Sequence, residues 1–171
     1  MYATGDRVMY PMHGAGIVQN IEEKLIDGNP ASYYVLNLPL GNMTVTVSTT
    51  KTEKLGIRPI ISEEECATTL DNPEIILDAI PDNWTKRYEY NLAKLKSGKL
   101  SEAIEVYICL FTRERQKGLS GMEKKLLSTA KNVISSEIMV CYGIDRIKAE
   151  DFLRVIVDKH DQSKGQAAQA V

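Results

Sequence analysis

Residues 81–95 read PDNWTKRYEYNLAKL and separate two parts of the chain that are patterned differently. The part before this stretch is rich in β-branched residues and turn signals, and in the part after it apolar residues recur at helical spacing. A proline disfavours helical backbone in the residue before it, and an asparagine side chain can accept a hydrogen bond from a free N–H of a first helical turn. Pro81 and Asn83 therefore predict a helix with Trp84 in its first turn.

The role of Trp84, the only tryptophan of the chain, has two interpretations. A large flat ring at a helix start, beside Lys86 and Arg87, suits a contact with nucleic acid. Tryptophan is also commonly buried in protein cores. The local sequence is compatible with both interpretations.

The first 61 residues predict a small β domain. Residues 43–48 read MTVTVS, in which apolar and polar side chains alternate as in a half-buried strand. The sequence DGNP at 27–30 is a strong hairpin signal, because glycine and asparagine tolerate the positive φ angles of tight turns. Strands are expected at 7–10, 15–26, 32–38, 43–48 and 57–60. So many short antiparallel strands predict a small, strongly bent barrel whose exposed edges can dock another sheet.

Residues 62–160 predict a compact all-α domain of about five helices. Residues that can cap a helix start alternate with glycines that can end one. They are Ser62, Asn83, Ser101, Ser120 and Asp145 for the starts, and Gly98, Gly118 and Gly143 for the ends. The acidic stretch 62–82 is expected to hold two short helices, the second beginning at Pro73. From Asp161 the chain is polar and rich in small residues, which predicts a disordered tail over 161–171.

The net charge is −2, but acidic and basic side chains are distributed unevenly along the chain. Residues 63–83 carry seven acidic and no basic side chains, whereas residues 84–132 carry eleven basic and five acidic ones. A basic segment of this kind is compatible with a polyanionic partner such as DNA. The alternative is that these cations only form solvated helix faces.

Other functions are disfavoured by what the sequence lacks. No apolar run approaches the ~20 residues of a membrane-spanning helix, and the N-terminus lacks a signal pattern, so we expect a cytosolic protein. Cys66, Cys109 and Cys141 are far apart, which suits small buried side chains in a reducing compartment. His13, in a turn, and His160, near the tail, stand outside any catalytic motif, so we expect no enzyme activity, metal, cofactor or small-molecule substrate.

The helical part holds one group of residues that suits DNA. Trp84, Lys86 and Arg87 fall on one helical turn. Lys124 and Lys125 lie at the start of another helix, whose free N–H groups also suit a phosphate. Cations bind the phosphate backbone without reading its sequence, and an apolar side chain can wedge into a minor groove. This combination predicts recognition of distorted DNA rather than of a base sequence.

Two motifs resemble one family of bacterial transcription regulators. The opening GDRVMYPMHGAG at 5–16 resembles that of the CarD/CdnL regulators and is similar to the RNA-polymerase-interacting domain of the transcription-repair coupling factor. The stretch NWTKRYEYNLAKLKSG at 83–98 resembles the helical domain of the same family, as does the stretch 113–124. The likeness covers roughly residues 1–157 in order and spacing.

The resemblance implies a two-domain α+β protein. A Tudor/SH3-like β-barrel at 1–61 is expected to dock on the β subunit of bacterial RNA polymerase. A helical domain at 62–160 is expected to contact promoter DNA at the upstream edge of the transcription bubble. The resemblance implies a polymerase contact for Lys24 and for the strand residues Met43, Thr44, Val45, Thr46 and Val47.

By the same resemblance Trp84 is a minor-groove wedge that stabilises the open complex, with Lys86 and Arg87 near the DNA backbone. The implied protein is a global regulator in the cytoplasm, associated with the nucleoid through polymerase, whose DNA binding is largely independent of sequence. Two residues depart from the family pattern. Thr46 stands where other members carry arginine, which bears on affinity for polymerase. Glu89 stands where some members carry a basic residue, which bears on affinity for DNA.

Two other classes of function stay open from the sequence. One is an architectural DNA-binding protein that works without polymerase. The other is a protein-only adaptor in which Trp84 is part of the core.

Overall fold

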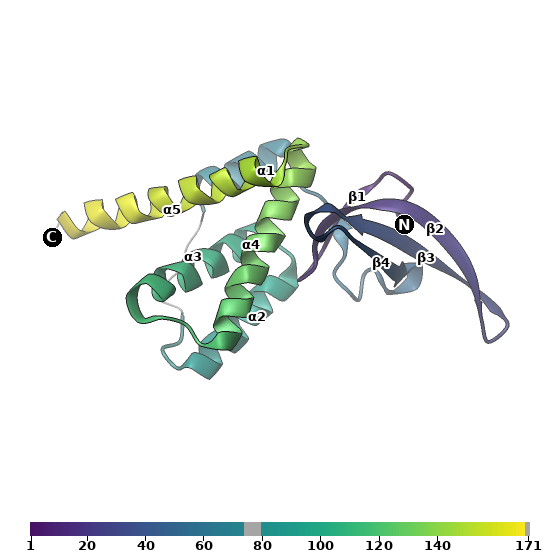
Figure 1. Cartoon of the computed structure of the whole chain (residues 1–171), viewed down its shortest axis with the longest axis horizontal. Helices are drawn as coiled ribbons and strands as arrows, with labels where there is room; N and C mark the ends of the chain where they lie inside the picture. The colour runs from purple at the N-terminus through teal and green to yellow at the C-terminus, as the bar shows by residue number, and fades with distance from the viewer. Residues whose placement is uncertain (74–79, 170–171) are drawn as a thin grey trace.

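A computed structural model describes residues 1–73 and 80–169, with the backbone alone for 163–169 (Figure 1). A β module and a helical module lie side by side, which confirms the two-domain α+β architecture. The strands are β1 (Arg7–Tyr10), β2 (Gly14–Ile26), β3 (Asn29–Leu38), β4 (Met43–Ser48) and β5 (Arg58–Pro59), with short 3-10 turns at Pro39–Gly41 and Thr49–Lys51. The helices are α1 (Glu63–Asp71), α2 (Trp84–Ser97), α3 (Leu100–Lys117), α4 (Gly121–Tyr142) and α5 (Arg146–Gln169).

The five strands form one antiparallel sheet in the order β4-β3-β2-β1-β5. The β2–β3 hairpin turns at Asp27 and Gly28, whose φ angles of 51° and 79° are the positive values that a two-residue turn requires. The hairpin extends away from the helices (Figure 1). In the part of the chain that the structure describes, no ladder joins β4 to β5. The predicted barrel is therefore an open, curved sheet with β4 and β5 at its edges.

β1 buries side chains on both of its faces. Val8 packs into a small core of the β module, together with residues such as Val18, Leu36 and Val47. Met9 points the other way, because successive side chains of a strand alternate, and it packs into the core of the helical module. Both side chains have no exposed surface. The two modules therefore share a core along β1.

The predicted caps explain most helix ends. Asn83 accepts hydrogen bonds from the N–H groups of Thr85 (3.0 Å) and Lys86 (3.2 Å), and Gly98 ends α2 with a φ of 73°. The caps at Ser62, Ser120, Asp145, Gly118 and Gly143 are also present. The predicted cap at Ser101 is wrong. Helix α3 begins earlier, at Leu100, whose side chain is buried against the helical core.

The C-terminal helix differs from its predicted length. α5 continues to Gln169, so the backbone from Asp161 through that residue, predicted from the sequence as a disordered tail, is helical. Asp161 lies 2.8 Å from Arg115 of α3 in an exposed ion pair. The Ala-, Gln- and Lys-containing sequence that follows is compatible with a helix once its start is anchored. The second acidic helix, predicted to begin at Pro73, lies outside the described residues.

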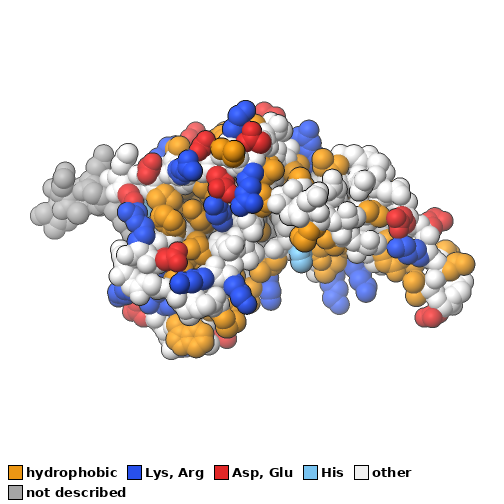
Figure 2. Space-filling view, viewed as in Figure 1, with side chains coloured by type: hydrophobic (Ala, Val, Ile, Leu, Met, Phe, Trp, Pro, Cys, Tyr) orange, Lys and Arg blue, Asp and Glu red, His pale blue; other side chains and the backbone are white. Residues whose placement is uncertain are grey.

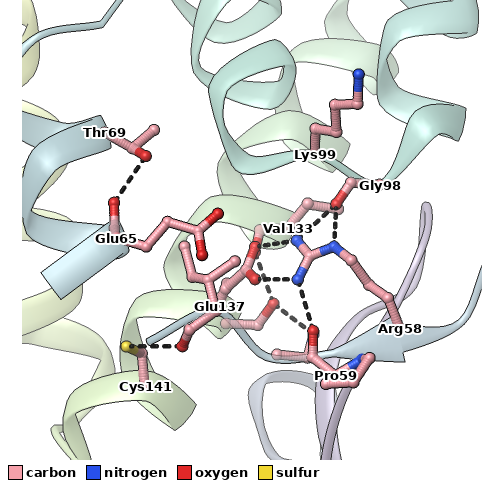
Figure 3. A network of polar contacts seen from close by, with 12 residues as sticks. Arg58, Pro59, Glu65, Thr69, Gly98, Lys99, Val133, Glu137 and Cys141 are labelled. Atoms are coloured by element: carbon pink, nitrogen blue, oxygen red, sulfur yellow. Dashed lines mark hydrogen bonds and ion pairs between the residues drawn. The ribbon is translucent and has the colours of Figure 1, made fainter. Parts of the chain in front are cut away.

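A partly buried polar network joins the two modules (Figure 3). The Arg58 guanidinium of β5 meets the Glu137 carboxylate of α4 at 2.7 and 2.9 Å and donates to the Gly98 carbonyl at 2.6 and 2.9 Å. Glu137 is fully buried, and burial raises its pKa, although Arg58 opposes that shift. Ala15 of β2 also donates its N–H to Ser136 Oγ at 2.8 Å. These contacts, with the shared core, hold the two modules in one orientation.

We expect Gly14→Ala to loosen this interface. Gly14 has a φ of 103°, and a Cβ atom there would lie 2.7 Å from Ser136 Oγ. A positive φ costs an alanine roughly 1–3 kcal/mol, and a clash in a packed interface adds about as much. Gly5→Ala is the matched control, because Gly5 has a φ of 94° and nothing within 4 Å of its would-be Cβ. Urea denaturation should show a clearly larger loss for Gly14→Ala, and equal losses would contradict a tightly packed interface.

Within the described residues, no helix combines the length and the apolar character that crossing a membrane requires.

Candidate functional site

Trp84 is the first residue of α2, and 53% of its surface is exposed. It belongs to neither of the two cores that the described residues form. Asn83 caps the helix directly before it, so the indole projects from a well-defined helix start. A tryptophan held in this way presents apolar surface to a partner.

The orientation of α2 separates Glu89 from Trp84. The helix buries Arg87, Asn91 and Leu95, and it exposes Lys86 and Glu89. At 3.6 residues per turn, Glu89 lies about 140° around the axis from Trp84, and only about 60° from Lys86. The acidic side chain is therefore beside Lys86, on the side of α2 that faces away from the core, rather than next to the indole.

Arg87 corrects one prediction from the sequence. Its side chain is buried, with 2% exposed, so it is no free cation for a DNA phosphate. Nε and Nη2 lie 2.8 and 2.7 Å from Glu123 Oε1, and Nη1 donates to the carbonyls of Asp82 (2.7 Å) and Pro81 (3.3 Å). Arg87 thus joins the start of α2 to the start of α4.

Glu123 completes this joint from the α4 side. Its Oε2 accepts from the backbone N–H of Ser120 (3.1 Å) and from the Ser120 hydroxyl (2.9 Å) in a capping box. Burial alone would raise the pKa of Glu123, but the hydrogen bonds from Ser120 and the guanidinium of Arg87 outweigh it and lower that pKa. The carboxylate is ionised at neutral pH and locks the two helix starts together.

Exposed residues surround the joint. Lys124 and Lys125 are exposed on the first turn of α4, and Met122 beside them is 50% exposed. Both helix starts lie at the lower end of the helical module in Figure 1. We call Trp84, Lys86, Met122, Lys124 and Lys125 the helix-start surface. Neither the exposure of Met122 nor the pairing of Arg87 with a residue 36 positions away has a signal in the local sequence pattern.

Two other cations of the basic segment, Lys94 and Lys99, are paired. Lys94, with 20% of its side chain exposed, lies 2.5 Å from Glu105 and over the Tyr90 ring. Lys99 pairs with Glu102 at 3.6 Å. Part of the positive charge between residues 84 and 132 therefore lies in ion pairs within the helical module, whereas Lys86, Lys124 and Lys125 are exposed on the helix-start surface.

The β module carries the open β4 edge. Among the described strands, β4 pairs with β3 and leaves its other side open, from Met43 to Ser48. Thr44 and Thr46 are exposed and Met43 is 47% exposed, whereas Val45 is half-buried. Val47 is 5% exposed, so its side chain belongs to the β core and only its backbone is available at the edge. An open edge of this kind can add a strand from a partner.

Lys24 lies apart from that edge, on the projecting part of the hairpin. It faces Ala31 in the β2–β3 ladder, and β3 separates it from β4. Its ammonium is 3.1 Å from Glu22 and 5.7 Å from the centre of the Tyr33 ring. With 49% of its side chain exposed, Lys24 is still accessible to a partner.

The histidine and cysteine side chains have structural surroundings. His13 packs on the Tyr10 ring at 4.3 Å, and the three cysteines are free and buried. Burial raises the pKa of the Cys66 thiol to about 12, which makes it a poor nucleophile. Across the described parts of the chain, no three metal-ligating side chains gather into a candidate metal site.

The fold and its two surfaces define a class: a two-domain α+β protein with an open sheet edge in its β module and an exposed, lysine-bearing pair of helix starts in its helical module. Two family models match the chain, "CarD-like/TRCF RID domain" over residues 2–61 and "CarD, C-terminal domain" over residues 67–154. The chain is also 34% identical over 155 residues to YdeB of Bacillus subtilis (strain 168), whose name describes a candidate transcription factor. That match spans 89% of this chain and 99% of YdeB. The protein belongs to the CarD-like family of transcription factors.

Proposed function

We propose that the protein tethers itself to RNA polymerase through the β4 edge and stabilises the promoter open complex through the helix-start surface. The observation that carries this proposal is the 53% exposed Trp84 at the start of α2, locked by a buried ion pair to the lysine-bearing start of α4. The family supports a role in transcription. The proposed target of the edge is the β subunit.

At the polymerase end, backbone groups of β4 supply the main contact. An added strand gains affinity from main-chain hydrogen bonds and specificity from alternate side chains. Thr44 and Thr46 are the exposed alternate side chains of β4. Thr46 contributes no charge, so the contact here depends on the backbone and on the half-buried Val45.

At the DNA end, Lys86, Lys124 and Lys125 contact phosphates without reading bases. Trp84 wedges into the minor groove at the upstream edge of the bubble and opposes re-pairing. Three lysines alone give weak, salt-sensitive binding. The polymerase tether compensates for this, because it raises the effective concentration of the helix-start surface at the promoter.

The rigid junction between the modules fixes the position of the helix-start surface relative to the β4 edge. Arg58 and Glu137 hold β5 against α4, and Met9 lies in the helical core. A fixed orientation keeps Trp84 at one place relative to the β4 edge. The indole is thus presented to the DNA without the entropy cost of a flexible linker.

We expect Thr46→Arg to tighten binding to the docking lobe of the polymerase β subunit (the β lobe) by about 5- to 30-fold. An arginine at this exposed edge position can add a charge-assisted hydrogen bond, worth roughly 1–2 kcal/mol. Thr68→Arg is the matched control, because it adds the same charge to an exposed position of α1. Surface plasmon resonance with the full chain and the isolated β lobe measures both. No binding by the unchanged protein, or an equal gain from Thr68→Arg, would count against the edge as the docking site.

A further inference from the structure

A cavity of about 400 Å³ opens between α3, α4 and α5. In Figure 2 it is a recess with an apolar floor and a charged rim, lying between α5 and α3. Its lining residues are Tyr107, Phe111, Arg115, Lys131, Glu150, Leu153, Arg154, Val157 and Asp158. None of them belongs to the helix-start surface or to the β4 edge. The cavity therefore has no part in the function proposed above.

The floor of the cavity is aromatic and aliphatic. The rings of Tyr107 and Phe111 lie 5.6 Å apart and nearly parallel, at 26°. Tyr107 and Leu153 are almost fully buried, while Phe111 and Val157 are half-buried and face the opening. Small-molecule sites are mostly apolar, with a few placed polar groups, and have volumes of roughly 300–1,000 Å³. A flat apolar ring fits such a floor.

The rim carries two exposed guanidinium groups. Arg115 lies 5.8 Å from the centre of the Phe111 ring, and 59% of its side chain is exposed. The Arg154 side chain is 75% exposed. Their present partners, Asp161 and Asp151, are themselves about half exposed, so these pairs are weak and can be exchanged for a ligand anion. Guanidinium groups are well suited to carboxylates and phosphates.

One carboxylate that lines the cavity, Glu150, is paired with cations other than Arg115 and Arg154. Glu150 accepts from Lys131 at 2.9 Å and from Arg146 at 2.7 Å. Hydrogen bonds from Arg146 and Lys131 lower the pKa of Glu150, so it stays ionised with two cations beside it. Asp158 is the second lining carboxylate, against three lining cations. While Arg115 and Arg154 are paired with Asp161 and Asp151, the charges around the rim balance, and a ligand anion that replaces these two aspartates meets both guanidinium groups.

We propose that this cavity binds a small aromatic anion. Its ring would pack on Phe111, Leu153 and Val157, and its carboxylate, sulfonate or phosphate would meet Arg115 and Arg154.

The probe for this site is 8-anilinonaphthalene-1-sulfonate, a fluorescent aromatic anion, titrated into the full-length protein. We expect saturable binding of one equivalent, with Kd raised at least tenfold by Arg115→Glu and by Arg154→Glu. Lys148→Glu is the matched control, since it makes the same charge change at an exposed position of α5 outside the cavity, and it should leave Kd unchanged. Thermal melting followed by circular dichroism checks that every variant is folded.

Two further measurements test whether binding needs a negative charge and which anionic group the cavity prefers. N-phenyl-1-naphthylamine, the uncharged analogue of the probe, should bind at least tenfold more weakly and should not respond to the arginine substitutions. Displacement of the probe by AMP would assign a phosphate ligand, and displacement by indole-3-acetate would assign a carboxylate. Absence of saturable binding, equal effects of Lys148→Glu and Arg154→Glu, or displacement by neither competitor would overturn the proposal.

Discussion

Replacing Trp84 by alanine is expected to shorten the half-life of promoter open complexes formed with the protein by about 5- to 30-fold, toward the value without it. The physical reason is that an aromatic side chain stacked at a base step contributes roughly 1–3 kcal/mol. The lower part of that range, about 1–2 kcal/mol, corresponds to a 5- to 30-fold change in half-life. The indole is 53% exposed and outside the cores of the described chain, so protein stability should change little. The measurement is complex survival after a competitor challenge.

Two controls separate the wedge from other effects. Ile147→Ala removes an apolar side chain that is 75% exposed on α5, and it should leave the half-life unchanged. Binding of Trp84→Ala to the polymerase β lobe should equal that of the unchanged protein. If the open complex keeps its full half-life with Trp84→Ala, the indole does not stabilise it.

The largest expected loss of stability comes from Arg87→Ala. It leaves the Glu123 carboxylate buried without its guanidinium partner, and breaking a buried pair in this way costs roughly 3–5 kcal/mol. That is a large fraction of the ~5–15 kcal/mol that stabilises a typical domain. Arg154→Ala, which removes one partner of an exposed pair, should cost only about 0–1 kcal/mol. Urea denaturation measures both free energies of unfolding.

A second substitution shows whether the loss comes from the stranded charge. Glutamine at position 123 removes the charge and keeps a side chain that can complete the capping box with Ser120. Arg87→Ala combined with Glu123→Gln should therefore be more stable than Arg87→Ala alone. If the two losses simply add, the buried ion pair is not the cause.

The Arg87–Glu123 pair also makes the stability of the fold depend on pH. The folded-state pKa of Glu123 is lowered below its usual value of 4.5. The stability that it contributes is therefore present above about pH 4.5 and is lost as the pH falls through the lower, folded-state pKa. Glu137 acts in the opposite sense, because burial raises its pKa. The stability that Glu137 contributes is therefore lost as the pH rises from its unfolded-state pKa to its raised, folded-state pKa.

Local features of the fold could be predicted from the sequence. The DGNP turn, the cap at Asn83 and the capping box at Ser120 depend on neighbouring residues, and the structure contains all three. Conformational preference and short-range hydrogen bonds determine such features, so a few residues suffice to recognise them.

Features that depend on distant partners could not be predicted. The sequence places Arg87 among the DNA-contacting cations because it shows a charge but not its burial, and its partner Glu123 lies 36 positions away. The junction of Arg58 with Glu137 spans 79 positions and likewise has no local signal. Met9 reads as a strand residue, and only the packing of β1 on the helices shows that it belongs to their core.

The most direct test of the account is the half-life of a promoter open complex with and without the full-length protein. We predict a longer half-life when the protein is present, because the β4 edge holds it on polymerase while Trp84 opposes closure of the bubble. An unchanged or shorter half-life, under conditions where the protein is bound to polymerase, would contradict the proposed function.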